Sequence, residues 1–269
     1  MRIEDRGSRI EGKAGAALAP ESSHSDPLSW LAEPSSSPLA SRTSILNLQS
    51  SIPNPALHSL GLVEYQPTWD AMKRFTAERT PDGKIPGTRD EIWLLQHPPT
   101  YTQGLAGKPE HLLNPTDIPV VKIDRGGQIT YHGPGQIVAY LLLDMRRWKI
   151  GVRELVNVME NSVIDLLAEF GVHAVHRVDA PGVYVSGAKI AALGLKIKHG
   201  YCYHGLSFNV DMDLSPFNNI NPCGYQGLQV TQACALGITA NLNELQAQLA
   251  QNLIHGLQRH LASAGTAHQ

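Results

Sequence analysis

The sequence predicts one compact core that combines helices and strands. The chain has 269 residues, 42% of them apolar and 17% charged, which suits a globular core of about two hundred residues. Apolar runs of strand length occur at residues 91–96 and 137–143. Between residues 152 and 170, apolar side chains recur at alternating steps of four and three, which is typical of an amphipathic helix. Both kinds of element are therefore expected.

Charge and cysteine content narrow the class of protein. With 22 basic and 24 acidic residues the net charge is −2, so we expect no nucleic acid to bind through a basic surface. No apolar run reaches the roughly 18 residues that a membrane-spanning helix needs, so we expect no such helix. Cys202, Cys223 and Cys234 form no CxxC pair and leave an odd thiol in any disulfide scheme, which predicts a reducing, cytoplasmic location.

The first part of the chain differs in composition from the rest. Residues 1–53 are rich in Ser, Pro and Ala and show little periodicity, so we predict a disordered extension. Acidic residues and the lack of a long apolar run make its start a poor signal or transit peptide. We expect the folded domain at residues 54–263 and a flexible tail at 264–269.

A first helix is expected soon after the extension. Trp69, Met72 and Phe75 are spaced for one helical face, with Thr68 as the predicted N-cap and residues 81–83, Pro-Asp-Gly, as the stop. The next expected elements are short strands at residues 91–96, 100–103 and 119–124.

A glycine-rich stretch follows at residues 125–136, RGGQITYHGPGQ, and leads into the apolar run 137–143. Such a loop lets backbone groups approach a ligand closely, although two ordinary turns around a short strand would have the same composition. The stretch lacks both the GxxxxGK[ST] and the GxGxxG phosphate-binding patterns. His132 could donate a hydrogen bond or a proton near a site, or be an ordinary core or surface histidine.

The second half of the chain predicts a helix, an antiparallel meander and a final helix. Gly171 should end the helix that begins near residue 152. Strands at 183–185 and 188–198, joined through Ser186-Gly187, predict a hairpin that a strand at 201–210 extends. Asn241 and Glu244 form a capping-box pattern before a leucine stripe that we expect to lie in the core, at residues 242, 245, 249, 253 and 257.

Lys189 and Cys223 are the candidate catalytic residues. In a strand over 188–198, Lys189 shares a face with Ala191 and Leu193, and burial there should lower its pKa because desolvation disfavours the ammonium. Cys223 lies in the turn-like sequence Asn-Pro-Cys-Gly. A thiol beside a desolvated amine can be a nucleophile with its base. A snorkelling lysine and a cysteine buried as a small apolar residue are the structural alternatives.

A second group, His199, Cys202 and His204, raises the question of zinc, because histidine and cysteine are its usual ligands. On an extended strand Cys202 and His204 share one face and His199 points away. No second pair lies at finger-like spacing, so we expect no metal.

Several long motifs occur in order between residues 125 and 224, within a likeness that covers roughly Leu60 to Leu261. They are residues 125–136, DAPGVYV at 179–185, Lys189 with LGL at 193–195, HGL at 204–206, NVDMDLSPF at 209–217 and INPCG at 220–224. Together they closely resemble the lipoyl(octanoyl) transferases. The resemblance implies an α/β domain with a central mixed sheet flanked by helices, related to the catalytic domain of biotin and lipoate ligases.

The resemblance also implies roles for individual residues. Cys223 would be the nucleophile that becomes an acyl-thioester, and Lys189 would lower the pKa of its thiol. The implied substrate-binding residues are Arg125, Gly126, Gly127, Gln128, Ile129, Thr130, Tyr131, His132, Ala192, Leu193, Gly194, Gly205, Leu206 and Ser207. No metal or cofactor is implied, and we expect a monomer.

The activity implied is transfer of an octanoyl or lipoyl group from acyl carrier protein to a lysine of lipoyl domains, the first step of endogenous protein lipoylation. Acceptors would be the lipoyl domains of 2-oxoacid dehydrogenase complexes and the glycine cleavage H protein. An ATP-dependent lipoate or biotin ligase on the same fold is the nearest alternative, and it would not require Cys223. A silent acyl-binding or carrier-binding module would be expected to lack Lys189 or Cys223.

Overall fold

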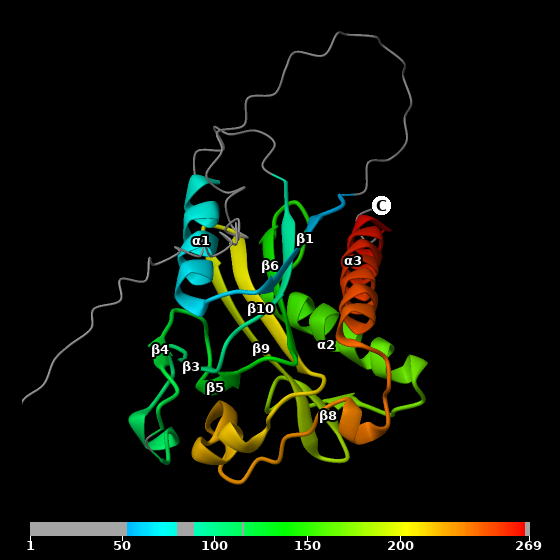
Figure 1. The fold of residues 1–269 in the computed structure, drawn as a ribbon. Coiled ribbons are helices and arrows are strands. Elements are labelled where there is room, and N and C mark those ends of the chain that lie inside the picture. The colour runs from blue at the N-terminus through cyan, green and yellow to red at the C-terminus, as the bar shows by residue number, and fades with distance from the viewer. Residues whose placement is uncertain (1–52, 80–88, 115, 267–269) are drawn as a thin grey trace, which may run out of the picture.

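A computed structural model describes residues 53–79, 89–114 and 116–266 of the chain (Figure 1). The predicted extension at 1–53, apart from its last residue, and the predicted helix stop at 81–83 lie outside these ranges. A seven-stranded sheet forms the centre, in the order β1 (Ala56–Leu62), β2 (Glu91–Gln96), β6 (Gln136–Asp144), β10 (Tyr201–Asn209), β9 (Ala188–Lys198), β8 (Val183–Val185) and β7 (Val175–His176). β1 is parallel to β2 and the other neighbours are antiparallel, so the predicted mixed sheet is confirmed.

Helices cover both faces of this sheet (Figure 1). Ile92 and Leu94 of β2 pack in a cluster with α2 (Val152–Glu169) and α3 (Leu242–Thr266), whereas Trp93 and Leu95 pack with α1 (Tyr65–Glu78). Successive strand residues point to opposite faces, so a strand covered on both sides is apolar throughout. This explains the unbroken apolar runs of β2 and β6.

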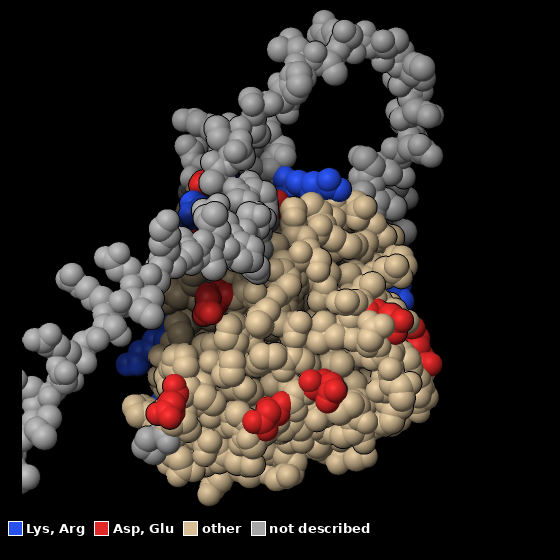
Figure 2. Space-filling model, viewed as in Figure 1, with Lys and Arg blue, Asp and Glu red and all other residues tan. Residues whose placement is uncertain are grey.

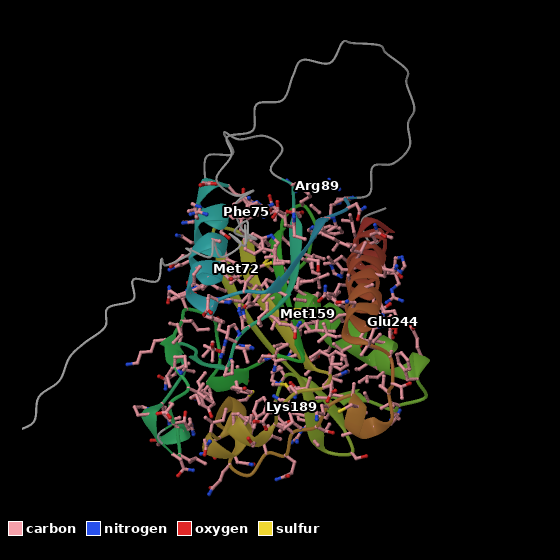
Figure 3. All side chains as sticks on the ribbon, in the orientation of Figure 1. Met72, Phe75, Arg89, Met159, Lys189 and Glu244 are labelled. Carbon is pink, nitrogen blue, oxygen red and sulfur yellow. The ribbon has the colours of Figure 1, made fainter. Side chains whose placement is uncertain are left out.

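The start of α1 differs from the prediction. The helix begins at Tyr65 after Glu64, and Thr68 lies in its first turn, where its hydroxyl donates to the Glu64 carbonyl oxygen over 2.7 Å. Thr68 is therefore not the N-cap. Met72 is fully buried against the sheet and Phe75 packs beside it, which agrees with the predicted helical face (Figure 3).

A second, small sheet carries the glycine-rich stretch. It has the order β4 (Val120–Lys122), β3 (Thr100–Gln103) and β5 (Ile129–His132). β5 is a short strand between turns, which was one of the two interpretations of this stretch. The preceding residues 125–128 line a cavity, as the other interpretation, a ligand-binding loop, predicted.

The predicted meander and the final helix are confirmed. β8 and β9 are joined through Ser186 and Gly187, which both have positive φ, and β10 pairs antiparallel with β9. The Asn241 side chain accepts from the Glu244 N–H over 3.0 Å, and the Glu244 carboxylate accepts from the Asn241 N–H over 3.1 Å. α3 continues to Thr266, so it overlaps the tail expected at 264–269, whose last three residues lie outside the described part.

The surface carries scattered charge. Figure 2 shows acidic side chains spread over the face in view, with no broad field of Lys and Arg among the described residues there. None of the described helices is both long and apolar enough to cross a bilayer.

Candidate active site

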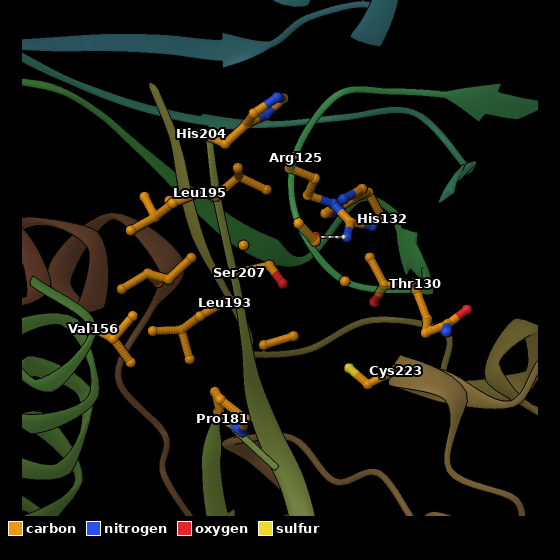
Figure 4. A pocket seen from close by; sticks show the side chains of 18 of the residues that line it. Arg125, Thr130, His132, Val156, Pro181, Leu193, Leu195, His204, Ser207 and Cys223 are labelled. Atoms are coloured by element: carbon orange, nitrogen blue, oxygen red, sulfur yellow. Dashed lines mark hydrogen bonds between the residues drawn. The ribbon is translucent and has the colours of Figure 1, made fainter. Parts of the chain in front are cut away.

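A cavity of about 370 Å³ lies beside the middle of β9, at residues 192–195 (Figure 4). β8 pairs only with residues 188–191 of β9. Beyond that point no described strand neighbours this edge of β9, and residues 192–195 border the cavity there. The loop 125–128 closes one side, where the Gly126 N–H donates to the Leu195 carbonyl oxygen over 3.0 Å. Val156 of α2 lies at the side opposite Cys223 (Figure 4).

Lys189 and Cys223 meet in this cavity. Lys189 is 3% exposed, and its Nζ donates to Cys223 Sγ over 3.2 Å and to the Pro181 carbonyl oxygen over 3.1 Å. A buried ammonium with a thiol as its hydrogen-bond partner is the arrangement that favours a thiolate nucleophile.

The backbone holds the two residues in register. Cys223 occupies the 3-10 turn Pro222–Gly224 with a φ of 56°, a strained conformation for a residue with a side chain. The segment after this turn bonds to both backbone polar groups of Lys189. The Lys189 N–H donates to Gln229 O over 2.8 Å, and the Thr231 N–H donates to Lys189 O over 2.9 Å. The chain that presents the thiol therefore also fixes the lysine backbone.

The electrostatics of the pair differ from the prediction. Burial by itself lowers the pKa of Lys189, but the negative charges that Cys223 and Tyr184 can carry outweigh burial, and the Lys189 pKa is raised. The expected lowering is therefore wrong, because it considered desolvation without the anionic partner. Lys189 is suited to hold the proton that the thiol loses.

Arg125 is a second buried cation on the cavity wall. Its guanidinium donates to Thr102 O over 2.8 Å, to Thr102 Oγ1 over 2.9 Å and to Gly126 O over 2.9 Å. Burial lowers the pKa of Arg125, but arginine remains a cation in proteins. A Cβ at Gly194 would lie 2.7 Å from Arg125 Cδ, so a glycine is required where this side chain crosses β9.

The structure places all but two of the predicted substrate-binding residues in the cavity wall. The residues that line it are Arg125, Gly126, Gly127, Gln128, Thr130, His132, Ala192, Leu193, Gly194, Gly205, Leu206 and Ser207. Ile129 and Tyr131 instead pack in the core beneath the small sheet, with Phe217. Side chains alternate along β5, so Thr130 and His132 face the cavity while their neighbours face away.

Comparison with known proteins gives the family. Residues 64–254 match the family model described as the lipoyl protein ligase A/B catalytic domain. The octanoyltransferase of Nitrosomonas europaea is 62% identical over 199 residues, which are 74% of this chain and 95% of that protein. The octanoyltransferase of Nitrosospira multiformis is 66% identical over 192 residues, 71% of this chain and 87% of that protein. The chain belongs to the octanoyltransferase family. It is an acyltransferase.

Solved structures of lipoate ligases share this octanoyltransferase fold. A bipartite lipoate protein ligase from Thermoplasma acidophilum superposes with a TM-score of 0.57 at 15% identity, covering 76% of this chain and 84% of that one. A lipoate-protein ligase A bound with ATP gives a TM-score of 0.56 at 14% identity, with 77% and 85% covered. The predicted relation to lipoate ligases is therefore confirmed at the level of the fold.

His132 is a fixed, neutral side chain. Burial, with the charge of nearby His97 next, lowers the pKa of His132 to about 3. Its Nδ1–H donates to Gln136 Oε1 over 2.7 Å, and its Nε2 accepts from the Thr102 hydroxyl over 3.2 Å. Both ring nitrogens are occupied, so His132 serves through hydrogen bonds to neighbouring side chains and does not transfer a proton.

A chain of hydrogen bonds that no sequence motif predicted continues from His132 towards Lys189. Gln136 Nε2 donates to Asn209 Oδ1 over 2.9 Å, and Asn209 Nδ2 donates to Thr231 O over 3.0 Å. Thr231 is the residue whose N–H bonds to Lys189. Gln136 begins β6 and Asn209 ends β10, and the antiparallel register that makes them partners is not encoded in any local sequence pattern.

The suspected zinc cluster has other partners. His204 Nε2 donates to Asp124 over 3.2 Å, and the Cys202 thiol donates to Leu141 O over 3.3 Å, while burial raises the pKa of Cys202 to about 12. Burial alone would raise the pKa of Asp124, but bonds from His204, Tyr203 and Trp69 hold it well below its usual range. Within the described ranges, no group of three or more His, Cys, Asp and Glu side chains is spaced to hold a metal ion.

Proposed function

We propose that this protein transfers an octanoyl or lipoyl group from acyl carrier protein to a lysine of a lipoyl domain through an acyl-thioester on Cys223. The observation that carries the proposal is the 3.2 Å contact between Lys189 Nζ and Cys223 Sγ inside the cavity. We assign this activity to residues 54–263. The family membership supports octanoyl as the acyl group.

The first half-reaction is thioester exchange. The Cys223 thiolate attacks the carbonyl carbon of the carrier-bound thioester, a new C–S bond forms, and the bond to the carrier sulfur breaks. Lys189 gives its proton to the departing carrier thiolate and becomes a neutral amine. One thioester replaces another, so the step is close to isoenergetic and requires no ATP.

The second half-reaction forms an amide. The acceptor lysine attacks the acyl group, and Cys223 leaves as a thiolate. An acceptor lysine that arrives as an ammonium loses two protons in this step: neutral Lys189 takes one and water takes the other. The ammonium and thiolate pair is thereby restored.

The cavity suits the chain of the acyl group. Each methylene removed from water contributes about 0.8 kcal/mol, and the side chains of Val138, Val156, Leu193, Leu195 and Leu206 supply apolar surface. Candidate donors for the oxyanion of each tetrahedral intermediate are the backbone N–H groups of the glycine-rich loop and of the turn at Cys223.

The proposed partners are octanoyl-acyl carrier protein as donor and lipoyl domains of 2-oxoacid dehydrogenase complexes and the glycine cleavage H protein as acceptors. We propose a cytoplasmic location, because the nucleophile must stay reduced and Cys202, Cys223 and Cys234 are all free thiols.

Intact-mass spectrometry after incubation with octanoyl carrier protein, without ATP, tests the proposal. We expect one added octanoyl group on Cys223, and its loss when a lipoyl domain is supplied. The Cys223→Ser protein should gain no such group. Transfer that requires ATP, or octanoate transfer by Cys223→Ser at the parental rate, would instead support a ligase mechanism.

A further inference from the structure

The helix α2 carries a buried carboxylate that contacts the segment before β8. Glu160 is 3% exposed, and its Oε1 accepts a hydrogen bond from the Gly182 N–H over 2.8 Å. No cation forms an ion pair with Glu160 in the described part of the chain, although the charges of His176 and Lys189 act on it from nearby. Burying a carboxylate without a close cationic partner is costly, so its presence calls for a compensating role.

The segment that Glu160 holds, residues 179–182, lies against the Lys189 side chain. Lys189 Nζ donates to Pro181 O over 3.1 Å, and the Tyr184 hydroxyl donates to Ala180 O over 2.7 Å. Gly182 has a φ of 144°, and a Cβ there would lie 2.9 Å from Lys189 Cε. This backbone therefore lies beside the end of the Lys189 side chain, at Cε and Nζ.

We propose that Glu160 is a positioning residue for Lys189: by holding the Gly182 peptide, it keeps the Pro181 carbonyl oxygen on Nζ and Nζ within reach of Cys223 Sγ. The inference rests on the proposed function, because it gives Lys189 the role of proton carrier. Without the bond from Glu160, the peptides at 181 and 182 can rotate, and the ammonium loses the acceptor that fixes its direction. Misplacement of a catalytic group by about 1 Å is enough to cost a large factor in rate.

Two substitutions at Glu160 separate position from charge. Glu160→Gln keeps an oxygen that can accept from the Gly182 N–H, whereas Glu160→Leu removes it. We expect Glu160→Leu to lower the maximal rate of Cys223 acylation by about tenfold or more and to leave KM for the octanoyl donor within about twofold. Its profile of Cys223 alkylation by iodoacetamide against pH should move to higher pH. Glu160→Gln should stay within about threefold of the parent in rate.

Exposed Glu169 on the same helix provides the matched control, because Glu169→Gln and Glu169→Leu change the same chemistry away from the site. Gly182→Ala is a second variant of the same segment, since its methyl group would lie 2.8 Å from the Ala191 carbonyl oxygen and 2.9 Å from Lys189 Cε. It should shift the alkylation profile in the same direction, and it keeps the inference testable if Glu160→Leu does not fold.

The outcomes separate the two proposals. A folded Glu160→Leu or Gly182→Ala protein with the parental alkylation profile overturns the positioning role. Failure of the parent to form acyl-Cys223 overturns the proposed function instead. Alkylation needs no acyl donor, so it tests the placement of Lys189 in either case.

Discussion

Buried charged side chains have different partners in two regions of this molecule. Asp90, which is 2% exposed, forms ion pairs with Arg79 and Arg147 and accepts a hydrogen bond from Trp148 Nε1 over 2.7 Å. In the cavity, Lys189 and Arg125 are also buried, but among the described residues no Asp or Glu forms an ion pair with either of them.

The difference separates a structural cluster from a reactive one. At Asp90 the fold itself supplies the opposite charge, so the cluster is complete before any ligand arrives. In the cavity no described carboxylate is paired with these cations, and a Cys223 thiolate or an oxyanion formed during acyl transfer supplies the opposite charge. The cost of burying these cations is met by anions that belong to the reaction.

Lys189→Met should have the largest effect on activity. The variant loses the ammonium beside Cys223 and the proton for the leaving thiolate, so acylation should slow by about a hundredfold or more. Its free energy of unfolding should not fall much, because an apolar side chain replaces a buried charge. Single-turnover acylation and urea denaturation measure the two effects. Lys196→Met, on the same strand, is the control; equal acylation rates in both variants would remove Lys189 from the mechanism.

Asp90→Ala should lower stability strongly and leave activity nearly unchanged. It leaves Arg79 buried without its carboxylate, which should lower the free energy of unfolding by about 3–5 kcal/mol. Acylation per folded molecule should stay near the parental rate, because Asp90 does not line the cavity. Asp165→Ala removes an exposed ion pair with Arg259 and should cost about 1 kcal/mol or less. A small loss in Asp90→Ala would contradict the contrast between the two regions.

The elements of the fold were predictable where the pattern was local. The continuous apolar runs of β2 and β6, the hairpin turn at Ser186-Gly187 and the capping box of α3 depend on residues close together in sequence. The start of α1 was not, because Glu64 offers no side-chain cap and Thr68 resembles one. A first-turn threonine that bonds to the preceding turn has the same composition as a true N-cap.

The two catalytic candidates could be identified from the sequence, but the side chains and charges that surround them could not. Lys189 on an apolar face and Cys223 in a turn were visible, but the sign of the lysine pKa shift depends on the distance between their side chains. Nothing in the sequence distinguishes Glu160 from the other polar residues of the helix predicted between residues 152 and 170. Its contact with Gly182 requires α2 to pack on the segment before β8, which no local pattern encodes.

Acid should destabilise the protein through histidines buried near the cavity. Burial lowers the pKa of His97 to about 4 and that of His132 to about 3, below the value of about 6.5 in an unfolded chain. The unfolded chain therefore binds more protons between those values, and the free energy of unfolding should fall by a few kcal/mol as pH drops from about 6.5 towards 4.

Urea denaturation at a series of pH values measures this slope. His132→Asn removes one of the two groups, so its unfolding free energy should depend less steeply on pH. His173→Asn, at an exposed histidine, should keep the parental slope. A parental slope in His132→Asn would mean that other groups dominate acid unfolding.

Arg125→Met should change stability least and so sharpens the comparison. It removes hydrogen bonds to Thr102 and Gly126, but it also removes a buried cation that no carboxylate compensates, and these effects oppose each other. We expect a change of about 1 kcal/mol or less in unfolding free energy, against the much larger loss in Asp90→Ala. Acylation should still slow by about tenfold, because Thr102, which donates to His132, loses the donor that orders the cavity wall. If Arg125→Met instead costs as much stability as Asp90→Ala, the cavity cations are structural, and the division between a completed and a reactive charge cluster fails.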